Sequence, residues 1–197
     1  KTDRSFNKTD RWTGSTMKHL ASLIAFIALC SASTAPDLQE NKPVASLEIL
    51  AATIGDSLQE LTNEQTALIP KRMIGKRKVT RGWTLDRKFI EETATTEFSG
   101  FKGESRAMFT FDEYENVFRW WVFDTYGVAS EYVGTWIPDE RSIKWEMAKE
   151  RTDGYTHSVL ERINADGTLE WEAKGRQRDG TLAVHQTGKS IPPATQK

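Results

Sequence analysis

The stretch ESRAMFTFDEYENVFRWWVFDTYGVASEYVGTWI, residues 104–137, shows the pattern that decides the fold. It consists of short aromatic-rich runs separated by turn-forming Asp, Asn and Gly. Runs of Phe, Trp, Tyr, Val, Ile and Thr at roughly 8 to 12 residue spacing are typical of an antiparallel β-barrel or sandwich. The same rhythm continues to Gln186. The sequence therefore predicts an all-β domain.

Further runs and turns extend this pattern in both directions. Asp-Gly pairs at 153–154, 166–167 and 179–180 favour tight hairpins, because Gly accepts a positive φ. No run between Lys76 and Lys189 is suited to a long crossover helix. Expected strands lie within 58–69, on both sides of a turn at 86–88, and at 104–111, 117–123, 128–137, 142–149, 155–163, 168–175 and 181–189. We expect an up-and-down meander of about nine or ten strands, closed into a barrel because closure removes exposed edges.

A short helix is expected before the strands. Val44, Leu47, Leu50 and Ile54 recur at steps of three and four residues, the spacing of one helix face, and Gly55 is a stop signal. We predict a helix over 44–54 that serves as a lid or plug of the barrel.

One expected strand, Val117–Phe123, is apolar on both faces. Phe118, Trp120 and Val122 share one face, and Val117, Trp121 and Phe123 share the other. The outer face needs a cover, which is either the helix or a second copy of the chain. A homodimer is therefore one of the predicted partners.

The segment before the barrel resembles an export signal. Met17 is followed by a basic residue, ten uncharged residues from Leu20 to Leu29, and a small-residue tract. This is the layout of a signal peptide, and the apolar run is about half of the ~20 residues that a membrane helix needs. We predict an upstream extension (1–16), a signal peptide cleaved after Ala32 (17–32), a tether (33–43), the barrel (44–191) and a tail (192–197), with export to the periplasm or the cell exterior.

Cys30 is the only cysteine in the sequence. Cleavage after Ala32 removes it, so the exported chain would have no disulfide and its core would hold the fold unaided. A lipoprotein, in which Cys30 is the acylated first residue, is the less favoured alternative, because the bulky Leu29 precedes it.

Composition indicates a globular protein without a polyanion-binding surface. The formal net charge is −1, hydrophobic residues make up 38% and charged residues 28%. Five basic residues crowd into 71–78, where a solvated strand entrance is favoured over a nucleic-acid or lipid contact. We predict no nucleic-acid partner and no stable membrane span.

Several motifs together carry a family resemblance. They are WTLDRKFI (83–90), FDE (111–113), FDTYG (123–127) and GTW (134–136). Over about residues 47–191, the chain resembles a bacterial domain family of unknown function with a lipocalin-like (calycin) barrel. Arg87 stands where that family usually has Gly, and Gly55-Asp56-Ser57 replaces the first Gly-x-Trp of such barrels. The resemblance implies a barrel fold and brings no established activity.

Signals for catalysis are weak. The sequence has no nucleophile elbow, phosphate-binding loop, dinucleotide fingerprint or zinc-protease motif. After cleavage only His157 and His185 remain, so no multi-histidine metal site is expected. Either can point inward by strand alternation, most simply as a core histidine. We predict no catalytic residues, no metal and no cofactor. Carboxylates are abundant, among them Glu97, Glu104, Asp112, Asp124, Glu131, Glu146, Glu161, Glu170 and Glu172, and most of them should face solvent.

Aromatic residues make the stronger functional case. Inward-facing tryptophans can line a pocket for an apolar or ring-shaped ligand, with an arginine for an acidic group. The candidate ligand-binding residues are Trp83, Trp120, Trp136, Trp145, Trp171, His157, Arg81 and Arg162. The same tryptophans can equally fill a barrel interior. We predict an exported, non-catalytic barrel that binds a small hydrophobic or amphipathic molecule. The alternatives are a structural protein that dimerises through the two-faced strand and, third, a hydrolase-type enzyme with an interior site.

Overall fold

The computed structural model describes residues 47–191 of the chain. The predicted upstream extension, signal peptide, tether and tail lie outside these residues, as does the start of the predicted helix. Among the described residues, no helix is both long and apolar enough to cross a membrane.

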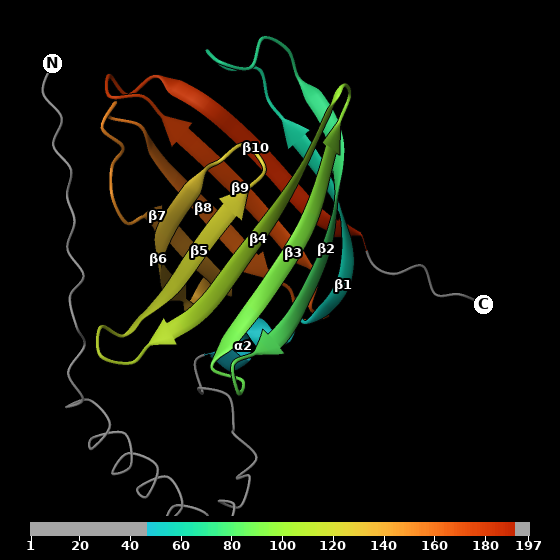
Figure 1. The fold of residues 1–197 in the computed structure, drawn as a ribbon, viewed down its shortest axis with the longest axis vertical. Helices are drawn as coiled ribbons and strands as arrows, with labels where there is room; N and C mark the ends of the chain where they lie inside the picture. Colours follow the sequence, from blue (N-terminus) through green and yellow to red (C-terminus); the bar gives the residue numbers. More distant parts are fainter. Residues whose placement is uncertain (1–46, 192–197) are drawn as a thin grey trace, which may run out of the picture. The chain divides into compact units, whose positions relative to one another are not determined.

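Within residues 47–191 the chain forms ten strands and one short α-helix, α2 (Glu48–Ala51) (Figure 1). The strands are β1 (Gly55–Asn63), β2 (Met73–Thr84), β3 (Phe89–Phe98), β4 (Phe101–Asp112), β5 (Val117–Asp124), β6 (Ala129–Ile137), β7 (Ser142–Met147), β8 (Thr156–Ile163), β9 (Leu169–Arg176) and β10 (Leu182–Ile191). A 3-10 turn, η2 (Pro138–Glu140), joins β6 to β7.

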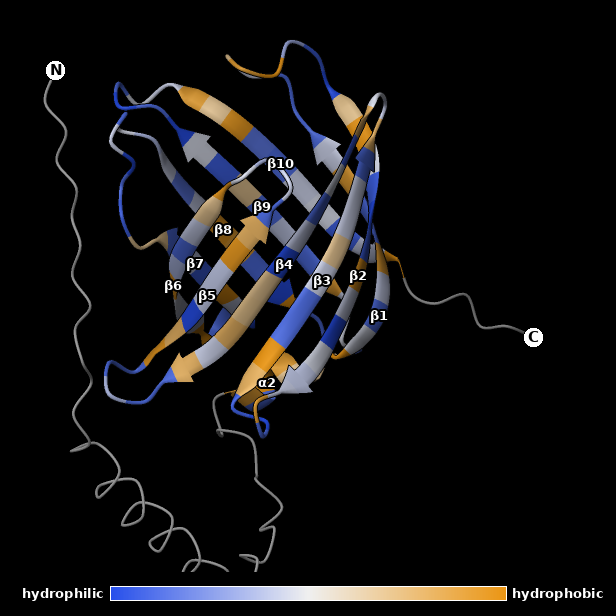
Figure 2. Cartoon of the chain, in the orientation of Figure 1, coloured by the Kyte–Doolittle hydropathy of each residue, from blue (hydrophilic) through white to orange (hydrophobic). Residues whose placement is uncertain are grey.

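The strands close into an antiparallel barrel. Each strand pairs with the next along the chain, and β1 also pairs with β10, with registers such as Leu61 opposite Gly188. The predicted up-and-down barrel is therefore confirmed. Figure 2 shows hydrophobic and hydrophilic residues interspersed along the strands, as expected where successive side chains point to opposite faces.

The Asp-Gly pairs form tight turns, as predicted. Their glycines, Gly154, Gly167 and Gly180, have φ angles of 80° to 83°. In each turn the aspartate Oδ1 accepts a hydrogen bond from the amide two residues later, at 2.9 to 3.1 Å. Positive φ angles are accessible to Gly without steric cost, so these pairs set the hairpin connections.

The turn between β2 and β3 achieves positive φ angles without glycine. Arg87, which replaces the Gly usual in the resembling family, has a φ of 60° and follows Leu85 and Asp86 at 48° and 55°. Its guanidinium lies over the Trp83 ring, 5.0 Å from the ring centroid. This cation–π contact accompanies the left-handed backbone there.

The helix is shorter than predicted. It spans only Glu48–Ala51, and Gly55 begins β1 instead of ending a longer helix. After Ala51 the chain forms a turn, in which the Thr53 amide donates to the Leu50 carbonyl at 3.0 Å and the Ile54 amide to the Ala51 carbonyl at 3.1 Å, each three residues earlier. The strand expected within 58–69 is β1, which begins earlier, at Gly55, and ends at Asn63. The plug role is confirmed, since Leu47 and Leu50 are 0% and 1% exposed within the main core cluster.

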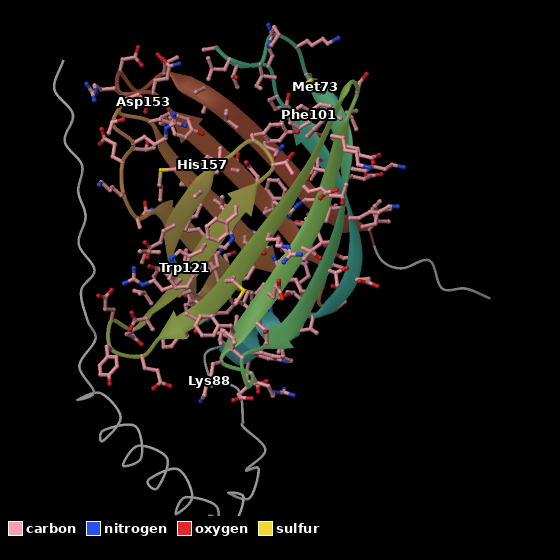
Figure 3. All side chains as sticks on the ribbon, viewed as in Figure 1. Met73, Lys88, Phe101, Trp121, Asp153 and His157 are labelled. Atoms are coloured by element: carbon pink, nitrogen blue, oxygen red, sulfur yellow. The ribbon has the colours of Figure 1, made fainter. Side chains whose placement is uncertain are left out.

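The two ends of the barrel differ. The start of β1 pairs with the last part of β2, so α2, which precedes β1, lies at the end of the barrel where β2 turns into β3 (Figure 1). Figure 3 labels Lys88 at this end and Met73 and Phe101 at the opposite one. The aromatic and aliphatic core, including Ile90, packs with α2 and closes its end.

Strand β5 carries apolar side chains on both faces, as predicted, and its outer face also carries Arg119, which pairs with Glu131 at 3.1 Å. On the inner face Phe118 is 2% exposed, whereas on the outer face Phe123 is 51% exposed. The helix packs into the barrel core, so it does not cover the outer face of β5. The sequence analysis named two possible covers for the outer face of β5, the helix and a second copy of the chain, and only the second copy remains as a prediction.

We predict that Gly134→Ala destabilises the barrel by about 1–3 kcal/mol, because overpacking a filled core strains it. A Cβ at Gly134 would lie 2.6 Å from the Trp145 ring, and Trp145 is fully buried. The matched control is Gly82→Ala, where a Cβ meets nothing within 4 Å. Urea unfolding of both variants measures the difference, and equal stabilities would contradict the prediction.

Candidate binding cavity

A cavity of about 660 Å³ lies inside the barrel, and each of the strands β1 to β10 contributes to its lining. Met73, Phe98 and Phe101, from the end opposite α2, are among its lining residues, so the cavity reaches that end. A larger hollow of about 1330 Å³ lies at the rim, mostly between the β7–β8 and β9–β10 loops. It is the more open of the two, and we take the interior cavity as the candidate site because its walls enclose a ligand.

Aromatic rings form much of the cavity wall. Trp120 stacks on Phe109 and Tyr132, with ring centroids 5.7 and 4.4 Å apart. Trp145 meets the Trp120 ring edge-on, at 5.5 Å, and Trp171 lines the cavity from β9. Such rings offer a large apolar surface whose geometry is held by mutual packing.

The structure brings five of the eight predicted ligand-binding residues to the cavity. These are Trp120, Trp145, Trp171, His157 and Arg81. Trp83 and Trp136 instead pack against the core cluster that α2 completes. Arg162 is exposed and alternates with the buried Glu161 and Ile163, so it lies on the outer surface.

A chain of buried ion pairs crosses the interior. Arg81 Nε donates to Glu92 Oε2 at 2.7 Å, and Arg81 Nη2 donates to Glu161 Oε1 at 3.0 Å. Arg81 Nη1 donates to Thr53 Oγ1 at 2.9 Å, which connects the chain to the segment between α2 and β1. All three guanidinium nitrogens of Arg81 are therefore engaged by the protein itself.

The other members complete the chain. Arg77 Nη2 donates to Glu92 Oε1 at 2.6 Å, and the Trp145 indole donates to Glu161 Oε2 at 3.0 Å. Both oxygens of each carboxylate are thus bonded. Burial alone raises the pKa of Glu92, but the charges of Arg77 and Arg81 outweigh burial and hold that pKa well below its usual range. Burial likewise opposes the charge of Arg81, and the two carboxylates raise its pKa above the usual value.

Sequence reasoning missed this network. Most carboxylates were expected to face solvent, but Glu161 is only 6% exposed, and neither Glu92 nor Arg77 was a candidate site residue. Alternation held the signal: Glu92 lies between Ile90 and Ala94 on the inner face of β3, and Glu161 lies between Val159 and Ile163. A charge in an otherwise apolar face indicates a buried, paired group. Which charges pair is decided by register across several strands.

His157 points inward, as predicted. Its Nδ1 lies 2.8 Å from the Tyr132 hydroxyl, and burial lowers its pKa from 6.5 to about 4. Burial also raises the pKa of Tyr132, so the hydroxyl keeps its proton and can donate it to Nδ1. The imidazole then presents Nε2–H as a donor. At neutral pH a group with so low a pKa is a weak general base.

His185 lies on the outer surface, unlike His157. Its neighbours Val184 and Gln186 line the cavity, and its Nε2 lies 2.8 Å from Glu172 Oε1. The expectation that His185 can point inward is wrong. Strand β10 shifts register between Leu182 and Val184, and from Val184 onward inward and outward side chains alternate, which places His185 outside. Within residues 47–191, no group of three or more His, Cys, Asp or Glu side chains is arranged to hold a metal ion.

Comparison with known proteins identifies the fold. The crystal structure of Rv2717c from M. tuberculosis matches with a TM-score of 0.56 at 15% identity, over 76% of this chain and 98% of that chain. The S-type phycobiliprotein lyase CPES from Guillardia theta matches with a TM-score of 0.50 at 10% identity, over 79% of this chain and 96% of that chain. The fold is a lipocalin-like barrel. At these identities the likeness is one of fold alone.

No protein-family model and no curated protein matches the sequence. Membership of the bacterial family of unknown function, inferred from the Trp83–Ile90 block and its companions, stays a prediction.

We predict that Glu92→Gln destabilises the protein by about 3–5 kcal/mol, because it removes the buried carboxylate that Arg77 and Arg81 share and leaves Arg81 with Glu161 alone. The matched control is Glu91→Gln, one residue away on the outer face, where the nearest cation is Arg106 at 3.9 Å. Exposed pairs of this kind contribute about 0–1 kcal/mol. Denaturant unfolding at neutral pH compares the two variants, and similar losses would contradict the role of the buried chain.

A second prediction concerns pH. Because His157 has a pKa of about 4 in the folded state and 6.5 when exposed, the unfolded chain binds more protons between these values. The contribution of His157 to stability is therefore present above pH 6.5 and is lost as the pH falls toward about 4, by about 3 kcal/mol in all. As the pH is lowered from 6.5 toward 4, the free energy of unfolding should decrease less in His157→Gln than in the wild type. Parallel pH profiles would show that His157 titrates normally.

Proposed function

We propose that the barrel binds a small hydrophobic or amphipathic molecule in its interior. The observation that carries the proposal is the interior cavity of about 660 Å³. Ligand pockets are typically about 300–1,000 Å³, and a barrel filled completely by its own side chains would leave no such space.

The shape of the barrel supports entry from one end. Leu47, Leu50 and the core around them close the α2 end. At the other end Phe101 and Tyr126 stack with ring centroids 4.9 Å apart and are 47% and 53% exposed. Both also line the cavity. An exposed aromatic rim that continues into an aromatic-walled cavity is suited to an apolar ligand body.

Regular strands supply most of the binding surface. The aromatic wall residues Phe109, Trp120 and Trp145 lie on β4, β5 and β7 and contact one another. Because strand residues are held by neighbouring ladders, they move less than loop residues, and a site on them is preorganised. Ligand binding then costs little ordering of the protein.

The exposed outer face of β5 favours a second candidate function, self-association. Phe123 is 51% exposed beside the half-buried Trp121, and neighbouring apolar side chains on a surface are a common feature of interfaces. This face is separate from the cavity, so the two functions have different tests.

The binding proposal predicts that N-phenyl-naphthylamine, a neutral fluorescent probe, binds with a saturating fluorescence increase. Val122→Phe adds volume to a residue that lines the cavity, and it should lower probe affinity about tenfold or more. The matched control is Val133→Phe on the outer face of β6, which should bind like the wild type. Titration of the three proteins, each with a native circular dichroism spectrum, provides the measurement.

Absence of probe binding, or equal affinity in both Val variants and the wild type, would contradict interior binding. A molecular mass that rises with concentration and falls in Phe123→Ser would instead support self-association through β5.

A further inference from the structure

We infer that the bound molecule is an amphipathic anion whose oxyanion, such as a carboxylate or sulfonate, binds to Arg77. The inference rests on the proposed binding function and names the chemical class of its ligand. The ligand body lies against the aromatic wall, and its charged group reaches the β1–β2 side of the cavity.

The charge order of the buried ion chain points to an anion. Charges alternate along Arg77, Glu92, Arg81 and Glu161, so one end of the chain is positive and the other negative. The indole of Trp145 occupies the second oxygen of Glu161 at the negative end. The positive end, Arg77, lines the cavity with its side chain 17% exposed.

Arg77 has unused donors. Its Nη2 donates to Glu92, while its Nε and Nη1 donate to no side chain or backbone group in the described part of the chain. A guanidinium can bind an oxyanion through two parallel hydrogen bonds, and such charge-assisted pairs are the strong ones. A ligand oxyanion would complete the coordination that Glu92 begins.

Gln59 provides an independent observation beside Arg77. The two residues are direct cross-strand partners on β1 and β2, and both line the cavity. Gln59 Oε1 accepts a hydrogen bond from the Trp171 indole at 3.3 Å. Because an indole is a donor only, this bond fixes the amide orientation and leaves Nε2 as the free end.

The free end of Gln59 is unsatisfied. Nε2 is buried and has no hydrogen-bond partner among residues 47–191. Trp120 Nε1, on the opposite wall, is likewise buried without a partner there. An unpaired buried polar group costs about 1–3 kcal/mol. Both unsatisfied atoms are donors, and the one on Gln59 belongs to the residue paired with Arg77, where a ligand oxyanion would bring an acceptor.

A cationic ligand finds a poorer match. The interior carboxylates Glu92 and Glu161 have both oxygens bonded. Two further carboxylates, Glu104 and Asp124, line the cavity near its mouth. Asp124 Oδ1 accepts the amides of its own turn, and Glu104 is exposed, where salt screens its charge.

The test compares two probes that differ only in an oxyanion. Anilinonaphthalene sulfonate is N-phenyl-naphthylamine with one added sulfonate. We expect Arg77→Met to weaken sulfonate binding about tenfold or more and to leave the affinity for the neutral probe unchanged, because only the sulfonate uses the guanidinium. The matched control is Lys78→Met, which removes the same charge from the exposed face of β2 and should change neither affinity.

A second variant guards against misfolding of Arg77→Met, which also deprives Glu92 of a partner. Gln59→Glu keeps an oxygen for the Trp171 indole and replaces the free amide donor with a carboxylate oxygen. It should weaken sulfonate binding about tenfold or more and spare the neutral probe.

The outcomes separate this inference from the proposed function. If the neutral probe binds and the sulfonate affinity is the same in the wild type, Arg77→Met and Gln59→Glu, the anion inference is overturned and interior binding stands. If neither probe binds the folded wild type, both fail. Selective loss of sulfonate binding in the folded variants, with Lys78→Met unaffected, supports the inference.

Discussion

The pairing of β1 with β10 is the interaction on which the rest of the structure depends. It joins the first and last strands through a ladder that runs from Leu58 opposite Ile191 to Asn63 opposite Gln186. Without it, the sheet would have two exposed edges and no enclosed interior. With it, the inner faces of all neighbouring strands are removed from water together, and α2 closes one end of the resulting space.

Enclosure also explains the buried charges. Once Arg81 and Glu92 lie inside, each needs partners from other strands, because an unpaired buried charge is far more costly than an exposed one. Glu161 comes from the far side of the ring of strands and lies 80 residues away in sequence, yet its carboxylate meets Arg81 at 3.0 Å. Such a chain of ion pairs favours one register of the strands. It also places charged groups beside the aromatic wall of the cavity. Closure of the barrel by the β1–β10 pairing therefore brings an apolar wall and charged groups together in one cavity.

Much of the fold could be predicted from particular residues. The alternation through Phe118, Trp120 and Val122 and the turns at Asp153, Asp166 and Asp179 depend on local geometry, which a sequence expresses directly. The extent of the helix could not be predicted in this way. Leu47, Leu50 and Ile54 have helical spacing, but after Ala51 the chain turns, and Thr53 Oγ1 accepts a hydrogen bond from Arg81, 28 residues away in sequence. The spacing of apolar residues does not express such a tertiary contact.

By itself, the sequence determined an all-β meander, its hairpin turns, and which side chains can share a face with His157 and the inward tryptophans, because these depend on the two-residue period of a strand. Tertiary structure alone decided that Trp83 and Trp136 fill the closed end while Trp120, Trp145 and Trp171 surround a cavity. It also decided that all three guanidinium nitrogens of Arg81 are bonded within the protein, whereas Arg77, which lines the cavity, uses only Nη2 within the described residues. The physical reason is that depth along a barrel and the pairing of charges depend on strand register and tilt, which are set by hydrogen bonds between segments distant in the sequence.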